Sequence, residues 1–138
     1  MEGAQSAIKL LNDAGYLVFV VTNQAGIARG YYDAAAVDTL HDWMQGQLAA
    51  IGAHIDDFRF CPHHPEGTVP ALAIVCDCRK PGTGMLKSLI KQWQPEMSHS
   101  FMLGDSDKDA QAGAAVGMLG KKIEPASILS EVKAILAL

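Results

Sequence analysis

The 138-residue sequence lacks the features that mark membrane-spanning, secreted and nucleic-acid-binding proteins. No apolar run approaches the roughly 20 residues that a membrane-spanning helix needs. The first residues, Met1-Glu2-Gly3-Ala4-Gln5, do not resemble the basic and then apolar start of a signal peptide. The net charge is −4, so no overall positive field favours nucleic acid or an anionic membrane. Any attraction for an anionic ligand must come from a few local cations.

Cysteine is scarce and unevenly placed. The chain has three cysteines, an odd number, and all of them lie within residues 61–78. This distribution argues against a disulfide framework and for a reducing compartment, so we expect a cytoplasmic protein.

Length and composition predict one globular domain, residues 1–138, with 49% apolar and 19% charged residues. Apolar periodicity predicts helices over residues 3–14, 84–93, 107–116 and 127–136. A further long helix is predicted after a cap at Asp33, with Val37, Leu40, Met44, Leu48 and Ile51 on its buried face. Strands are predicted at residues 16–21, 57–61, 100–103 and 121–123.

The alternation of strands and helices predicts a three-layer, Rossmann-like α/β fold with a mostly parallel sheet. Ligands of such sheets bind beyond the carboxyl ends of the strands. Thr22, the region around Lys80, and Asp105 all fall where such ends are expected.

The segment from Thr22 to Gly30 follows the first predicted strand. A hydroxyl at a strand end, followed by Asn23, Gln24 and a glycine turn, suits an oxyanion or a phosphate. The same residues would also suit a polar turn whose amides satisfy the local backbone, and the sequence leaves both interpretations open.

The cysteine segment predicts a metal. Cys61, His63, Cys76 and Cys78 provide three thiolates and an imidazole, a ligand set that closes a tetrahedral zinc site and makes it structural. Residues 61–80 form a long stretch without periodicity, and a zinc loop explains how it is held. The alternative is a group of buried free cysteines beside two surface histidines. His64 is expected to be a neighbour, because Cys61 and His63 alternate as Cys76 and Cys78 do.

Two further segments carry charge at expected strand or helix ends. Arg79 and Lys80 could hold phosphate oxygens, or they could be an ordinary solvated basic pair. Gly104-Asp105 follows an apolar strand, so Asp105 could ligate Mg²⁺. An acidic turn that caps the next helix through Asp107 is the alternative, and both can hold together.

Taken together, these segments resemble the haloacid-dehalogenase (HAD) superfamily of phosphatases. The similarity is greatest to the D-glycero-D-manno-heptose-1,7-bisphosphate 7-phosphatase family, with the histidinol-phosphate phosphatases beside it. It rests on the run from Val20 to Gly30, on Cys61-Pro62-His63-His64-Pro65, on Cys76-Asp77-Cys78-Arg79-Lys80-Pro81, and on Gly104-Asp105.

The resemblance implies a role for each matching residue. Thr22 and Lys80 would stabilise the transferring phosphoryl group, Asp105 would ligate a catalytic Mg²⁺, and the cysteine segment would hold zinc. The expected contacts to substrate are made by Thr22, Asn23, Gln24, Ala25, Arg79, Lys80 and Ser106. Ser106 departs from the family pattern, which often has a basic residue there, so the exact sugar phosphate is in doubt.

The nucleophile of the family is missing. Members begin with an apolar strand that ends in Asp-x-Asp-Gly, whose first Asp attacks phosphorus and whose second acts as general acid and base. The only Asp-x-Asp here is Asp105-Ser106-Asp107, which follows the Thr22 and Lys80 segments and precedes Lys108 instead of glycine. In the family fold, the missing strand lies between the Thr22 and Asp105 strands, so its loss should leave a gap of roughly 10 Å.

We therefore expect a domain incomplete at its N-terminus, with little or no activity as written. The prediction is an Mg²⁺-dependent sugar-phosphate phosphatase that is a monomer and binds neither nucleic acid nor membrane. Heptose 1,7-bisphosphate, cleaved at the 7-phosphate through an aspartyl-phosphate, is the expected substrate, and histidinol phosphate is the alternative. A catalytically inactive module that binds a phosphorylated ligand or a partner protein is the rival interpretation.

Overall fold

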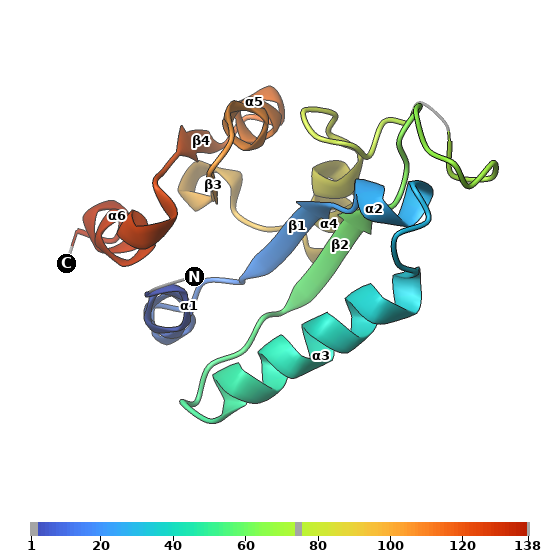
Figure 1. Ribbon diagram of the computed structural model, residues 1–138. Helices are drawn as coiled ribbons and strands as arrows, with labels where there is room; N and C mark the ends of the chain where they lie inside the picture. Colours follow the sequence, from blue (N-terminus) through green and yellow to red (C-terminus); the bar gives the residue numbers. More distant parts are fainter. Residues whose placement is uncertain (1–2, 74–75, 138) are drawn as a thin grey trace.

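The computed structural model describes residues 3–73 and 76–137 of the chain, and Figure 1 shows its helices and strands in order. The elements are α1 (Ala4–Asp13), β1 (Phe19–Asn23), α2 (Ala25–Ala28), α3 (Ala34–Ala49), β2 (Asp57–Cys61), α4 (Gly84–Trp93), the 3₁₀ turn η1 (Met97–His99), β3 (Phe101–Gly104), α5 (Asp107–Ala115), β4 (Leu119–Lys122), the 3₁₀ turn η2 (Pro125–Ser127) and α6 (Ile128–Ile135).

Most predicted elements are confirmed, and the first strand and the loop after it are corrected. The predicted strand 16–21 is observed as β1, which begins at Phe19 and ends at Asn23. Thr22 therefore lies inside the strand instead of after it. The predicted loop from Thr22 to Gly30 contains the short helix α2, which buries Ile27 and Ala28. Four residues are too few to show a helical period, which explains why the sequence did not reveal it.

The buried face of α3 is also corrected. The Asp33 carboxylate accepts a hydrogen bond from the backbone N–H of Ala36 at 3.0 Å, which confirms the predicted cap. However, Leu40 and Ile51 are 50% and 40% exposed. His41 is buried instead, stacked on Phe58 with 4.0 Å between the ring centres. The strands meet α3 along the line through Val37, His41 and Leu48.

The strands run parallel, as predicted, but in the described residues they form two pairs instead of one sheet. In the first pair, Phe19 of β1 lies opposite Asp57 of β2. In the second, Phe101 of β3 lies opposite Leu119 of β4. Among the described residues, no hydrogen-bonded ladder joins β1 to β3.

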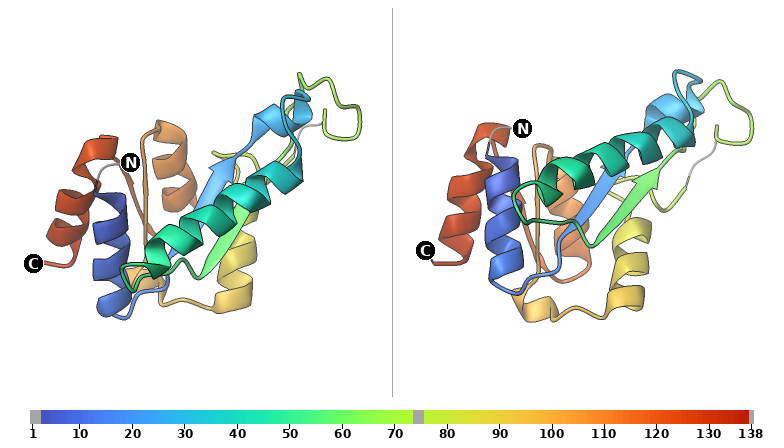
Figure 2. Two further views of the ribbon diagram at one scale, coloured as in Figure 1. Left: turned by 60° about the horizontal axis from the view of Figure 1, so that its bottom comes forward. Right: turned by 90° about the horizontal axis from the view of Figure 1, so that it is seen from below.

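Helices cover both strand pairs. Figures 1 and 2 show α3 along one face of the β1–β2 pair and α4 on the other. In the second pair, α5 packs on β3 and β4, while α1 packs against α6. The core beneath α3 is formed by Val18, Leu48, Ala53 and Ile55. This packing fixes the direction of each strand, so the carboxyl ends of β1 and β3 face the same side of the molecule.

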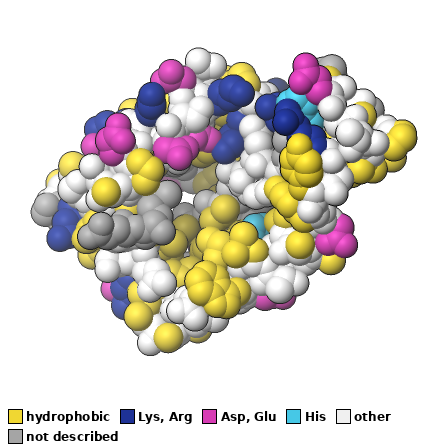
Figure 3. All heavy atoms as spheres, in the orientation of Figure 1, with side chains coloured by type: hydrophobic (Ala, Val, Ile, Leu, Met, Phe, Trp, Pro, Cys, Tyr) yellow, Lys and Arg dark blue, Asp and Glu magenta, His cyan; other side chains and the backbone are white. Residues whose placement is uncertain are grey.

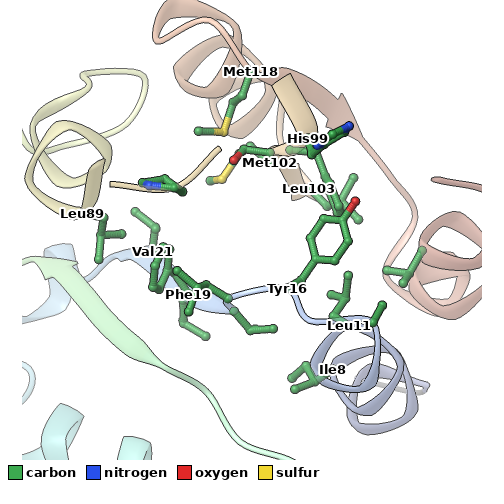
Figure 4. A pocket seen from close by; sticks show the side chains of 18 of the residues that line it. Ile8, Leu11, Tyr16, Phe19, Val21, Leu89, His99, Met102, Leu103 and Met118 are labelled. Carbon is green, nitrogen blue, oxygen red and sulfur yellow. The ribbon is translucent and has the colours of Figure 1, made fainter. Parts of the chain in front are cut away.

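An apolar cleft of about 620 Å³ separates the two pairs. Its walls include Phe19 and Val21 of β1 and Met102 and Leu103 of β3, with further apolar side chains from α1, α4 and α6 (Figure 4). The ring centres of Tyr16 and Phe101, which both line it, are 5.9 Å apart. The cleft lies where the sequence predicted a gap between the Thr22 and Asp105 strands.

Within the described part of the chain, the helices are too short or too polar to cross a membrane.

Candidate active site

The end of β1 presents Thr22, Asn23 and Gln24. The backbone N–H of Gln24 donates to the carbonyl of Cys61 at 2.8 Å, so the β1–β2 ladder continues to this point. The Gln24 side chain donates to the Thr22 hydroxyl at 3.2 Å and accepts from the Tyr32 hydroxyl at 2.5 Å. Thr22 itself makes only a long 3.4 Å contact to the Asn23 carbonyl. Its hydroxyl proton is therefore free to serve an incoming acceptor. Ala25 is the first residue of α2.

Lys80 is locked against the same strand end. Its backbone N–H donates to the Asn23 side-chain oxygen at 2.9 Å, and its carbonyl accepts from the Asn23 amide at 3.4 Å. The Lys80 ammonium then donates to the Val21 carbonyl at 2.9 Å and to the Asp109 carboxylate at 2.5 Å. Lys80 thus touches both strand pairs. Arg79, the residue before it, makes no hydrogen bond or ion pair among the described residues.

Asp109 belongs to this site and was missed by the sequence analysis. It is 6% exposed and accepts a hydrogen bond from the Ser106 backbone N–H at 3.3 Å. Gly104 is required beneath it, because a Cβ on Gly104 would overlap the Asp109 carboxylate. A signal for Asp109 was present, since Ser106 and Asp109 have the Ser-x-x-acid spacing of a capping box.

The predicted cap at Asp107 is wrong. Ser106 caps α5, and its hydroxyl accepts from the Lys108 backbone N–H at 3.2 Å. Asp107 is the first residue within the helix and is exposed. Asp105, just after β3, is exposed as well, and its carboxylate has no protein partner in the described part of the chain. A free carboxylate at a strand end fits a hard cation such as Mg²⁺.

The cysteine segment folds into a compact donor cluster. The ligand atoms of Cys61, His63, Cys76 and Cys78 all lie within 4.8 Å of one another. Cys78 Sγ is 2.8 Å from Cys61 Sγ and 3.1 Å from Cys76 Sγ. His63 Nδ1 is 3.3 Å from Cys78 Sγ. Zinc–sulfur bonds of about 2.3 Å correspond to sulfur–sulfur edges of about 3.8 Å, so the four donors fit zinc with a small outward movement. The cluster contains His63 and not His64, as predicted.

The thiols of the cluster differ in acidity. Burial raises the pKa of the Cys61 and Cys78 thiols. Burial acts in the same sense on Cys76, but hydrogen bonds with the Cys78 and Cys61 sulfurs outweigh it and lower the Cys76 pKa to about 7. The thiolate is the form that binds metal, so Cys76 is the thiol most ready to ligate near neutral pH.

The structure thus gathers the predicted residues around one edge. Hydrogen bonds join Thr22, Asn23 and Gln24 to Lys80, and the Lys80–Asp109 ion pair reaches the turn of Asp105 and Ser106. A hydroxyl donor and an ammonium on one side of the cleft, with a free carboxylate on the other, are typical of the HAD-like hydrolases.

Comparison with known proteins supports this class. A family model described as HAD-hydrolase-like matches residues 77–120. The D-glycero-beta-D-manno-heptose-1,7-bisphosphate 7-phosphatase of Rhodopseudomonas palustris is 48% identical over 136 residues, which are 99% of this chain and 76% of that protein. The enzyme of the same name from Salmonella typhi is 42% identical over 89% of this chain and 65% of its own length.

Solved structures agree with the sequence comparisons. The D,D-heptose 1,7-bisphosphate phosphatase from B. bronchiseptica, complexed with magnesium and phosphate, matches with a TM-score of 0.83 and 28% identity. The match covers 99% of this chain and 83% of that one. This chain belongs to the D-glycero-D-manno-heptose-1,7-bisphosphate 7-phosphatase family. It spans between 61% and 76% of the three most similar curated relatives reported.

Proposed function

We propose that this chain provides most of the active site of an Mg²⁺-dependent phosphatase that hydrolyses D-glycero-β-D-manno-heptose 1,7-bisphosphate at the 7-phosphate. The names of the Rhodopseudomonas and Salmonella relatives support the reaction and the β anomer. A relative from Photorhabdus laumondii, at 40% identity, is named for the α anomer.

The observation that carries this proposal is the position of the Lys80 ammonium, between the Val21 carbonyl and the Asp109 carboxylate at the mouth of the cleft. A phosphoryl group bound there would meet the Thr22 hydroxyl and the Lys80 charge together, which stabilises the negative charge of the transition state. Asn23, Gln24, Ala25, Arg79 and Ser106 surround this position along the chain and are the proposed substrate contacts.

The attacking carboxylate must come from an added segment. The apolar walls of the cleft favour an extended apolar strand, and the parallel β1 and β3 favour one that runs in their direction. Such a strand, ending in Asp-x-Asp-Gly, would join the two pairs into one three-layer sheet. Its first Asp would form a P–O bond as the sugar oxygen leaves with a proton from the second Asp. Water would then hydrolyse the aspartyl-phosphate and return that proton.

Two metals have separate tasks in this proposal. Asp105 is the residue of this chain that would ligate Mg²⁺, and the ion would shield the phosphate charge from the attacking carboxylate. Cys61, His63, Cys76 and Cys78 would hold zinc, which fixes the loop of residues 61–80 and therefore the backbone of Lys80. The thiol-dependent zinc site favours the reducing cytoplasm as the place of action.

The direct test compares the chain as given with the same chain preceded by an apolar segment ending in Asp-x-Asp-Gly. We expect release of phosphate from heptose 1,7-bisphosphate only by the extended protein. Extension with Asn-x-Asn-Gly is the matched control, because it fills the cleft equally but offers no nucleophile. Equal turnover by all three proteins would contradict the mechanism.

A non-catalytic function is the second candidate, because the only Asp-x-Asp of the sequence lies in the turn after β3. Tight binding of a phosphorylated ligand by the chain as given, without turnover and without Mg²⁺, would favour it. Histidinol phosphate is the alternative substrate, and its hydrolysis by the extended protein in preference to heptose bisphosphate would replace the sugar assignment.

A further inference from the structure

Two hydrogen-bond donors face each other at the end of α2. Arg29 Nη2 lies 3.4 Å from His64 Nε2. The other ring nitrogen of His64, Nδ1, accepts the backbone N–H of Glu66 at 3.0 Å. A neutral imidazole with an accepting Nδ1 carries its proton on Nε2, and a guanidinium offers donors only. Arg29 and His64 therefore present two N–H groups to one place, with no acceptor of their own between them.

A third donor of the same side chain is unsatisfied. Arg29 Nε is buried and has no hydrogen-bond partner in the described part of the chain. Leaving a buried donor unpaired costs about 1–3 kcal/mol, and more when the group is charged. Three unmatched donors on two adjacent side chains indicate that the site is built for an acceptor ligand.

The backbone around this pair is held firmly, so the donors are preorganised. The Ala28 carbonyl accepts the backbone N–H of Val69 at 2.8 Å, and the Arg29 carbonyl accepts the Thr68 hydroxyl at 2.8 Å. These two bonds attach the end of α2 to the loop that carries His64.

The local charge selects an anion. Slight burial, Arg79, Arg29 and Lys108 lower the pKa of His64, while Glu66 acts in the opposite sense. Three cations and one carboxylate thus act on this place. Figure 3 shows histidine and basic side chains gathered at the end of the molecule that carries α2 and the loop after β2. Arg79 immediately precedes Lys80, so this charge lies next to the proposed reaction site.

We propose that Arg29 and His64, with Arg79 and Lys108 close by, form a second anion subsite that binds the non-reacting phosphate of a bisphosphorylated substrate. The guanidinium would grip two phosphate oxygens, and the His64 Nε2–H would donate to a third. This assignment rests on the proposed function, because it adds to the reaction site a residue set that distinguishes bisphosphates from monophosphates.

The ¹⁵N–¹H side-chain signals of the zinc-loaded chain test the subsite without any need for turnover. Inorganic phosphate is the probe. We expect the Arg29 Nε–H and His64 Nε2–H signals to shift and saturate, and Arg29→Gln to abolish the shift at His64. Lys133→Gln, which removes an exposed cation of α6, is the matched control and should change neither shift. Unchanged Arg29 and His64 signals at phosphate concentrations that shift Thr22 would overturn the subsite.

A second measurement separates this proposal from the proposed function. Calorimetric titration should show that Arg29→Gln weakens binding of heptose 1,7-bisphosphate by about 10–100-fold, the effect of losing one or two charge-assisted hydrogen bonds, and leaves the 7-phosphate unaffected. Equal weakening of both ligands would assign Arg29 to the loop's structure alone. If the phosphate shifts occur but heptose bisphosphate neither binds nor reacts in the extended protein, the proposed function fails and the anion subsite stands.

Discussion

The Lys80 ammonium lies 2.5 Å from the Asp109 carboxylate, and this ion pair connects the two strand pairs at the carboxyl end of the cleft. The side chains of Lys80 and Asp109 are only 12% and 8% exposed. Because the pair is shielded from water, removing one partner leaves a charge that cannot be fully hydrated.

The first prediction concerns the stability contributed by this pair. Lys80→Ala and Asp109→Ala should each lower the free energy of unfolding by about 3–5 kcal/mol, because each leaves a buried charge unpaired. The double variant should lose clearly less than the sum of the two. Urea unfolding of all four proteins measures the coupling, and additive losses would show that the two groups do not interact.

The second prediction concerns turnover in the extended protein. Lys80→Ala should reduce kcat by orders of magnitude, because the cation that faces the phosphoryl group is lost. Lys121→Ala is a suitable control, since Lys121 is half exposed and pairs with Glu131 on α6. Near-normal turnover by the Lys80 variant would remove it from the proposed role.

The third prediction concerns the cysteine cluster. The chain should bind one zinc ion, and Cys78→Ser should abolish binding because it removes one of the four donors. Protease should then cut residues 62–80 more rapidly. Elemental analysis and limited proteolysis measure the two effects. His64→Gln should retain the zinc, and loss of zinc in that variant would mean that the ligand set is wrong.

The fourth prediction is a pH dependence of stability that originates at His41. Burial lowers the pKa of His41, although Asp38 and Asp42 oppose the change. The folded protein therefore holds the neutral ring, and the unfolded chain takes up the proton first as the pH falls. Stability from this group is fully present above about pH 6.5 and is lost as the pH falls through the folded value.

Substitution isolates this contribution. His41→Phe keeps a ring against Phe58 but cannot be protonated, so its unfolding free energy should depend less on pH between about 7 and 5. The difference in slope cannot exceed about 1.4 kcal/mol per pH unit for one proton. Denaturant unfolding at several pH values measures it. Identical slopes for the two proteins would exclude His41 as the source.

The fifth prediction uses two glycines. Gly104→Ala should destabilise the protein by more than about 1 kcal/mol, because the new methyl group would displace the Asp109 carboxylate from Lys80. Gly46→Ala, within α3, meets no atom within 4 Å and should stabilise the chain by about 0.5–1 kcal/mol. Thermal unfolding compares the two, and equal effects would contradict the close approach at Gly104.

Periodicity predicted the elements of this fold well, because each long helix buries a regular face. Helix α4 was predicted at its observed bounds, and the Asp33 cap was recognised from its side chain. The exposure of Leu40 and the burial of His41 could not be predicted, since both follow from where the strands lie against α3. The sequence analysis foresaw an opening between the Thr22 and Asp105 strands only through resemblance.

The site was predicted in part for a similar reason. Residues that stand at strand ends, such as Thr22 and Asp105, can be found from the order of elements alone. Asp109 could not be found in this way, because its importance comes from a long-range contact with Lys80 across 29 positions of the chain. Arg29 and His64 were unremarkable in sequence, and only their approach shows that both offer donors to one place.

The open cleft has a thermodynamic signature. Heat capacity change and denaturant sensitivity on unfolding both scale with the surface that folding removes from water. Side chains that line the 620 Å³ cleft are already in contact with solvent in the folded chain and contribute little to either quantity. A strand that enters the cleft should therefore increase the unfolding heat capacity and the m-value by more than its own residues account for. Calorimetry can thus report whether the molecule is open or filled, independently of any catalysis.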